Sequence, residues 1–269
     1  MRFALPFLAI AISVAVPQIV GRFLDIQPHS PQRAAVGLVI ALCVLLSYRA
    51  SVGAIEKRKI VELDLKTAPA AFGTGAVLGS GLFCLTMLVL WLCGVWTFTG
   101  FHTLFDLFYP LAGALVAACM EETVIRGLLF RLLEESLGSW IALALTAVVF
   151  GLLHAFNQGA TVQSTIAIVL TAGILLVAAY MYTRSLWFVI GIHAAWNYTE
   201  GGIFAASVSG GKTEGFVGVQ FSGSDILTGG AFGPEASIVV IPICLLAGLV
   251  FIFMARRRGL VVQPFWRRT

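Results

Sequence analysis

Six polar side chains lie inside long apolar stretches of the sequence, where such groups are rare. They are Glu121, Glu122, Arg126, His154, His193 and Asn197. An ionisable side chain at the centre of a membrane costs about 3 kcal/mol on insertion scales, so it is retained where it faces the protein interior and pairs. Six such groups indicate a functional site, because hydrogen bonding between helices alone does not require charged residues.

The spacing of these residues predicts which of them meet. Glu122 and Arg126 are four residues apart, so on a helix they share one face and form a pair. His193 and Asn197 have the same spacing and point into one cavity. Glu121 projects about 100° away from Glu122 and therefore faces a different neighbour.

These residue types can activate water and hydrolyse an amide. Arg126 keeps the nearby carboxylate charged, whereas the second carboxylate, in apolar surroundings, is free to act as a base. A histidine can hold or donate a proton, and an asparagine with a histidine can stabilise a developing oxyanion.

Other membrane protease designs do not fit the sequence. No histidine is followed by glutamate, which excludes the HExxH zinc motif. No aspartate lies within an apolar stretch, which excludes a pair of intramembrane aspartates. The embedded pair Ser80-Gly81 has no histidine on its own stretch and is typical of helix packing.

The elements that position the six residues are membrane helices. The chain has 269 residues, of which 59% are apolar and 11% charged, against about 25% charged in soluble domains. A net charge of +4, with basic residues in short clusters, does not favour nucleic-acid binding.

Helices of about 20 apolar residues are expected at 3–20, 34–48, 70–93, 107–133, at two places within 136–183 divided by 157–159, and at 185–198 and 236–255. The fold class is an all-α, polytopic bundle of about eight transmembrane helices with the active site in the membrane interior.

Basic residues predict the orientation of this bundle. With the N-terminus inside, 13 of the 17 basic residues are cytoplasmic, Arg126 lies within a span, and Arg22, Arg33 and Lys212 are exterior. Both termini are therefore expected in the cytoplasm of a multi-pass protein of the bacterial inner or plasma membrane. We divide the chain into N-terminal helices and a cytoplasmic loop (1–106), a catalytic core (107–200), an exterior Gly/Ser-rich loop (201–235), and a last helix with a basic tail (236–269).

The depth of the six residues can be estimated from the helical rise. Counted from Arg131, Glu121 lies about 15 Å from the inner edge, and His193 lies about 14 Å from Arg184. His154 comes out at about 24 Å if its helix begins at Gly138, which does not match the others.

Three motifs then carry a resemblance. Glu121-Glu122-Thr-Val-Ile-Arg126 matches EExxxR, Phe150-Gly-Leu-Leu-His154 matches FxxxH, and His193-Ala-Ala-Trp-Asn197 matches HxxxN. In this order the sequence resembles the CPBP family, which comprises type II CAAX prenyl endopeptidases and bacterial relatives linked with bacteriocin processing and self-immunity. The resemblance covers about residues 107–198.

This resemblance implies an intramembrane protease in which Glu121 activates water and Glu122 with Arg126 supports and orients it. His154 would assist the base or bind water, and His193 with Asn197 would form an oxyanion hole. No cofactor is required by this scheme. Zinc is the alternative, held by His154, His193 and Glu121 with one open position.

The implied partner is a membrane-associated peptide or protein in the lipid bilayer. Eukaryotic members of the family cut after a prenylated cysteine, so the resemblance allows a lipid on the substrate. Two other functions stay open. A non-catalytic immunity or scaffold protein would not need all six polar groups, and a proton-coupled transporter is disfavoured by the absence of an internal repeat.

Overall fold

The computed structural model describes residues 1–24 and 30–268, without the side chains of residues 21–23, so the exterior position expected for Arg22 lies outside it. Three π-helical segments, η3 (Thr123–Phe130), η4 (Val169–Gly173) and η5 (Thr199–Ile203), continue helices α4, α6 and α8. The described α-helices are α1 (Ala4–Phe23), α2 (Pro31–Glu56), α3 (Ala68–Leu92), α4 (Phe108–Glu122), α5 (Arg131–His154), α6 (Val162–Ile168), α7 (Ile174–Thr183), α8 (Leu186–Tyr198), α9 (Asp225–Thr228) and α10 (Val240–Arg257).

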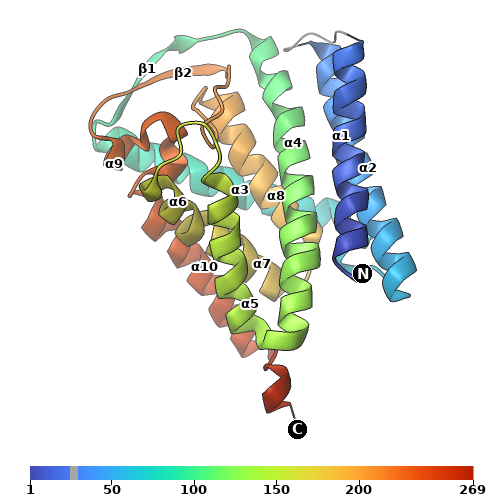
Figure 1. Ribbon diagram of the computed structural model, residues 1–269. Coiled ribbons are helices and arrows are strands. Elements are labelled where there is room, and N and C mark those ends of the chain that lie inside the picture. The colour runs from blue at the N-terminus through green and yellow to red at the C-terminus, as the bar shows by residue number, and fades with distance from the viewer. Residues whose placement is uncertain (25–29, 269) are drawn as a thin grey trace.

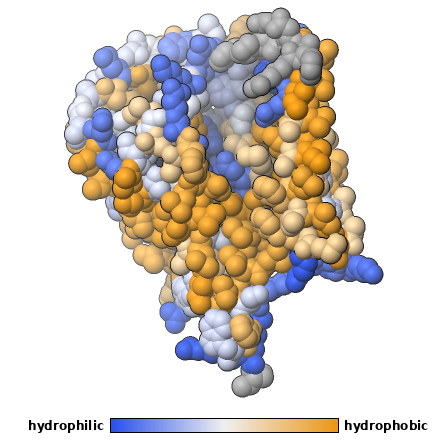
Figure 2. All heavy atoms as spheres, in the orientation of Figure 1, coloured by the Kyte–Doolittle hydropathy of each residue, from blue (hydrophilic) through white to orange (hydrophobic). Residues whose placement is uncertain are grey.

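The structure is an all-α membrane bundle, as predicted. It is 74% helical, and five helical runs of the described residues are long and apolar enough to cross a membrane. One of these runs, 104–154, has 51 residues and bends at Gly138, so it passes through the bundle twice. On the face that Figure 2 shows, apolar side chains cover most of the body of the molecule, and hydrophilic ones gather toward its two ends. The protein is therefore an integral membrane protein.

Two connections are more ordered than the sequence indicated. The connection between the predicted spans 70–93 and 107–133 contributes β1 (Trp96–Phe101), which pairs antiparallel with β2 (Val217–Phe221) of the predicted exterior loop. Alternating Trp, Thr and Phe residues favour this extended conformation. The small sheet joins the end of α3 to the 199–239 segment (Figure 1).

Helix α2 is longer than expected. The sequence predicted a span at 34–48, whereas the helix has 26 residues. It begins where the Ser30 side chain accepts a hydrogen bond from the backbone N–H of Arg33, and it ends where Lys57 adopts a left-handed conformation. The charged Arg49 remains inside the helix because its side chain reaches the carbonyl of Leu63.

Small residues bring α3 and α8 into close contact. A Cβ atom at Gly79 would lie 2.2 Å from the carbonyl oxygen of Ile192, and one at Gly75 would lie 2.2 Å from that of Phe188. Glycines spaced four apart let two membrane helices approach backbone to backbone. Thr199 donates a hydrogen bond to Ser80 at the same contact (2.9 Å between the hydroxyl oxygens). Ser80 therefore packs helices, as predicted, and α8 is fixed at the level of His193.

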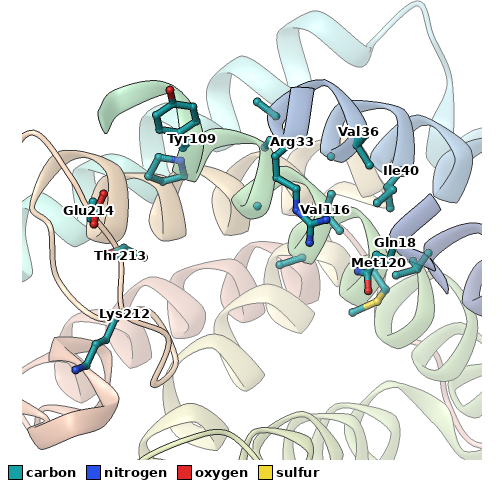
Figure 3. Close-up of a pocket in the computed structure, with 17 residues that line it drawn as sticks. Gln18, Arg33, Val36, Ile40, Tyr109, Val116, Met120, Lys212, Thr213 and Glu214 are labelled. Atoms are coloured by element: carbon teal, nitrogen blue, oxygen red, sulfur yellow. The ribbon is translucent and has the colours of Figure 1, made fainter. Parts of the chain in front are cut away.

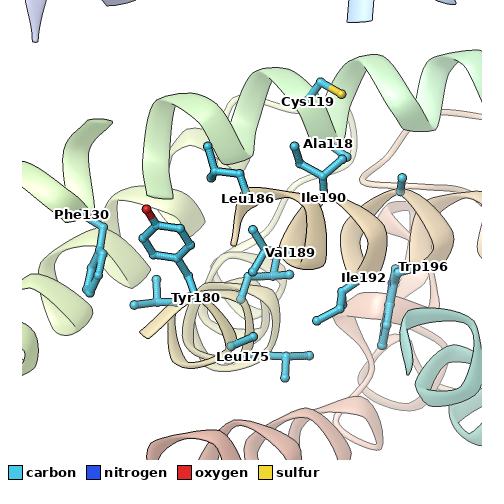
Figure 4. Close-up of a cluster of buried hydrophobic side chains, with 14 of the residues drawn as sticks. Ala118, Cys119, Phe130, Leu175, Tyr180, Leu186, Val189, Ile190, Ile192 and Trp196 are labelled. Atoms are coloured by element: carbon cyan, nitrogen blue, oxygen red, sulfur yellow. The ribbon is translucent and has the colours of Figure 1, made fainter. Parts of the chain in front are cut away.

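Helix α8 lies between α4 and α7 in the core of the bundle (Figure 4). Leu186, Val189 and Ile190 are buried side chains of α8 that pack in one apolar cluster with Ala118 and Cys119 of α4. The polar residues of α8 are thus carried by a rigid, buried helix.

Both chain termini lie at the same end of the bundle (Figure 1). Ion pairs gather there: Arg131 contacts Glu56 (2.7 Å between nitrogen and oxygen), and Arg184 contacts Glu134. An even number of passes through the bundle agrees with this arrangement.

Candidate active site

The first acidic motif lies at the end of α4. Arg126 Nη1 donates to Glu122 Oε1 at 2.9 Å, and both side chains are 0% exposed. The predicted pairing of these two residues is confirmed. Arg126 Nη2 also donates to the carbonyl oxygen of Ala172 at 3.0 Å. Ala172 belongs to the π-helical segment η4, where the regular hydrogen bonding of the helix is interrupted. The guanidinium group therefore joins α4 to the α6–α7 run.

Glu122 has a second partner that the sequence did not predict. His193 Nδ1 lies 2.9 Å from the same atom, Glu122 Oε1. A carboxylate paired with arginine is ionised and only accepts hydrogen bonds, so Nδ1 of His193 carries a proton. Glu122 thus orients the imidazole of His193 and directs its Nε2 away from the arginine.

His154 is held in a similar way by its own helix. Its Nδ1 lies 2.8 Å from the carbonyl oxygen of Phe150 and therefore donates a proton to it. The Nε2 of His154 then faces Glu121 Oε2 at 3.8 Å, and Nε2 of His193 faces the same oxygen at 3.9 Å. This carboxylate oxygen is buried and has no hydrogen-bond partner among the described residues.

Phe150 lies among these polar groups. Its ring centroid is 4.4 Å from the guanidinium carbon of Arg126 and 4.6 Å from the centroid of His154. From the sequence, Phe150 was part of the FxxxH motif and had no predicted role. Its spacing of four from His154 was the available signal, since residues four apart share a helix face. The Phe150 ring therefore packs against both Arg126 and His154.

The structure corrects the depth estimate for His154. Gly138 has a φ of 79°, and the helix that carries Glu121 continues past Arg131 to this point. Arg131 is therefore not the end of that helix. Counted from Gly138, Glu121 lies about 25 Å along one arm of the bend and His154 about 24 Å along the other. The two residues lie level because both arms have nearly the same length.

Two spaces open beside the site. A groove of about 260 Å³ is lined by Glu121, Ile125, Leu153 and His154, among others. On the other side of His154, a small cavity of about 30 Å³ has His193 and Asn197 in its wall, as their spacing predicted. All six residues predicted from the sequence thus gather in one region, five through direct contacts and Asn197 through this cavity.

A larger cavity lies between α1, α2 and α4 and the loop at residues 212–214 (Figure 3). It has about 430 Å³ and mostly apolar walls, and Arg33 projects into it from α2 toward Val116. Met120 lines both this cavity and the groove at Glu121. The cavity contains none of the six polar residues, so the chemistry lies in the smaller spaces.

The residues do not fit zinc as they are arranged. Ligand atoms about 2.0–2.1 Å from a tetrahedral zinc ion lie about 3.3 Å from each other, but His154 and His193 lie 3.8 and 3.9 Å from Glu121. No group of three donors among the described residues is close enough to hold a metal ion. This geometry gives no support for a metalloprotease.

Comparison with known proteins identifies one family. Residues 104–199 match the family described as type II CAAX prenyl endopeptidase Rce1-like. A search of curated proteins and a search of solved structures found no match. The resemblance drawn from the three motifs is confirmed, and the matched segment contains all six polar residues. The match supports a protease that acts on a membrane-associated protein in a lipid environment.

Proposed function

We propose that this protein is an intramembrane endopeptidase that uses a glutamate to activate water. The observation that carries the proposal is the position of Glu121 Oε2, a buried carboxylate oxygen that faces the Nε2 atoms of two histidines at 3.8 and 3.9 Å. These separations are too long for direct hydrogen bonds and suit a bridging water. Such a water is the nucleophile in our scheme.

The reaction begins with proton transfer from this water to Glu121. Because Nδ1 of His154 donates to the Phe150 carbonyl, Nε2 in the neutral ring accepts the second hydrogen of the water and orients its lone pair. The water oxygen then bonds to the substrate carbonyl carbon, and the carbonyl oxygen becomes an oxyanion. As the carbon–nitrogen bond breaks, Glu121 returns its proton to the leaving amine.

The oxyanion needs hydrogen-bond donors on the side of the substrate that faces away from Glu121. The side-chain amide of Asn197 supplies one in any protonation state of the site. His193 supplies another only when Nε2 is protonated, since its Nδ1 proton is engaged by Glu122. Asn197 is therefore the constant donor in this mechanism.

Glu121 rather than Glu122 is the base. Glu122 Oε1 already accepts hydrogen bonds from Arg126 and His193, so these two partners occupy it. No cation among the described residues is hydrogen-bonded to Glu121, and its side chain lines the groove through which a peptide can approach. The substrate is a membrane-associated protein, and a lipid attached to it would enter along the apolar side of this groove.

The test compares cells that carry the wild type, Glu121→Gln or a matched control, Glu135→Gln. Glu135 is a half-exposed glutamate at the end of the bundle where the termini lie. Mass spectrometry of protein C-termini should find a membrane-anchored product with the wild type and the control, and not with Glu121→Gln. Turnover by purified enzyme on a peptide copying that cleavage site should fall to background in Glu121→Gln.

Near wild-type turnover by folded Glu121→Gln would refute the assignment of the base. Zinc is measured on each preparation. Activity that follows stoichiometric zinc and disappears with a chelator would make His154 and His193 ligands and overturn the mechanism without metal. A set of C-termini that is the same in all three strains would favour a non-catalytic immunity or scaffold role.

A further inference from the structure

A third glutamate, outside the three motifs, reaches the active site. Glu235 lies in a short 3-10 helical turn, Pro234–Ala236, before α10 and is only 6% exposed. The hydroxyl of Ser209 donates to its Oε1 at 2.6 Å. Both residues belong to the segment 201–235, which was predicted to be an exterior loop. The mechanism proposed above does not use them.

Glu235 and Ser209 line the same small cavity as His154, His193 and Asn197. The cavity has about 30 Å³, which is room for about two water molecules and not for a substrate side chain. Apolar residues such as Ile168 and Leu175 form much of the remaining wall. Polar groups that line so small a space can act on one another through water.

The amide of Asn197 can turn either its oxygen or its nitrogen toward the cavity, and only the NH₂ group can stabilise an oxyanion. Because the Ser209 hydroxyl donates to Glu235 Oε1, this oxygen is held as an acceptor, and an acceptor selects the orientation in which the NH₂ group of Asn197 faces it. Burial raises the pKa of Glu235, and the Ser209 hydroxyl together with the nearby imidazoles of His154 and His193 limits that rise.

We propose that Glu235, held by Ser209, is a positioning residue that fixes the donor orientation of Asn197 across the small cavity. The inference rests on the proposed endopeptidase function and extends it. Glu235 acts through Asn197 and does not touch the reacting atoms. One NH of the amide is directed toward the acidic wall, and the other is left for the oxyanion.

The test is a double-mutant cycle with Glu235→Gln and Asn197→Ala in the purified full chain. The substrate is the synthetic peptide that copies the cleavage site found with the wild type. Asn197→Ala alone should lower kcat by about 10²–10³-fold. Glu235→Gln has the same shape but can also donate, so it should lower kcat roughly 10-fold with KM unchanged. In the Asn197→Ala background, Glu235→Gln should lower kcat by less than about twofold.

Three further variants keep the test decisive. Glu235→Asp restores the carboxylate and should recover part of kcat. Asp225→Asn, an exposed acid of the same segment, should leave kcat and KM unchanged. If Glu235→Gln does not fold, Ser209→Ala replaces it in the cycle, because it removes the 2.6 Å hydrogen bond and retains the acid.

If Glu235→Gln lowers kcat by the same factor with and without Asn197, the inference is overturned and the proposed function stays intact. A change in KM alone would do the same. If the wild type yields no product that depends on Glu121, the proposed function fails first, and the inference fails with it.

Discussion

Removing the charge of Arg126 should destabilise the protein strongly. Arg126→Met keeps most of the side-chain volume but removes every N–H donor. Glu122 then remains 0% exposed with His193 as the partner of Oε1, while its Oε2 has no partner among the described residues. Leaving one member of a buried ion pair uncompensated costs about 3–5 kcal/mol. The carbonyl of Ala172 loses its donor at the same time.

The assay is unfolding of the purified protein in mixed micelles with increasing SDS, followed by circular dichroism. Arg257→Met is the matched control, because Arg257 is exposed, and surface changes fall within about 0.5 kcal/mol. Glu122→Gln combined with Arg126→Met should recover more than half of the lost stability, since neither charge is then left alone. The reasoning is refuted if Arg126→Met is as stable as Asn197→Ala, a neutral deletion, or if the double variant loses the sum of the single costs.

Two other predictions concern orientation and pH. In a background without native cysteines, a thiol reagent that does not cross membranes should label Ser222→Cys from outside and should not label Lys57→Cys, and the opposite pattern would reverse the predicted orientation. Burial raises the pKa of Glu62, but hydrogen bonds from Arg58 and Tyr48 outweigh burial and leave the pKa below its usual value. The ionised Glu62 therefore stabilises the fold at neutral pH, and this stabilisation is lost as the pH falls through the pKa of Glu62 in the folded protein. Glu62→Gln should be less stable than the wild type at pH 7, and the difference should shrink below about pH 4, so a difference that is constant with pH would contradict the assignment.

The sequence alone predicted the bundle and the meeting of its polar residues because both depend on simple periods. A membrane-spanning helix needs about 20 apolar residues, and a spacing of four residues places Arg126 beside Glu122. The contact between Glu122 and His193 was not predictable in this way. It joins residues 71 apart, and it depends on how closely α8 approaches α3 and α4, which the glycines of α3 decide.

The roles of Gly138 and of the 199–239 segment were also missed. A single left-handed glycine within an uncharged stretch gives little indication that a helix ends there, yet it sets the level of His154. Glu235 lies among Gly and Ser residues that resemble an ordinary exterior loop. Its place in the cavity follows from the return of the chain over the end of the bundle, and no local pattern encodes that path.

The two adjacent glutamates of α4 have different tasks because neighbouring helix positions face different directions. Glu122 turns into the bundle, where Arg126 and His193 share its Oε1. Glu121 turns toward the groove, where its Oε2 faces two imidazoles. An arginine that stabilises the first carboxylate as an anion also fixes the ring of His193, and this ring in turn faces the second carboxylate. A variant of Arg126 that still folds should therefore lose turnover through the misplacement of His193, even though Arg126 is about one helical turn from the reacting atoms.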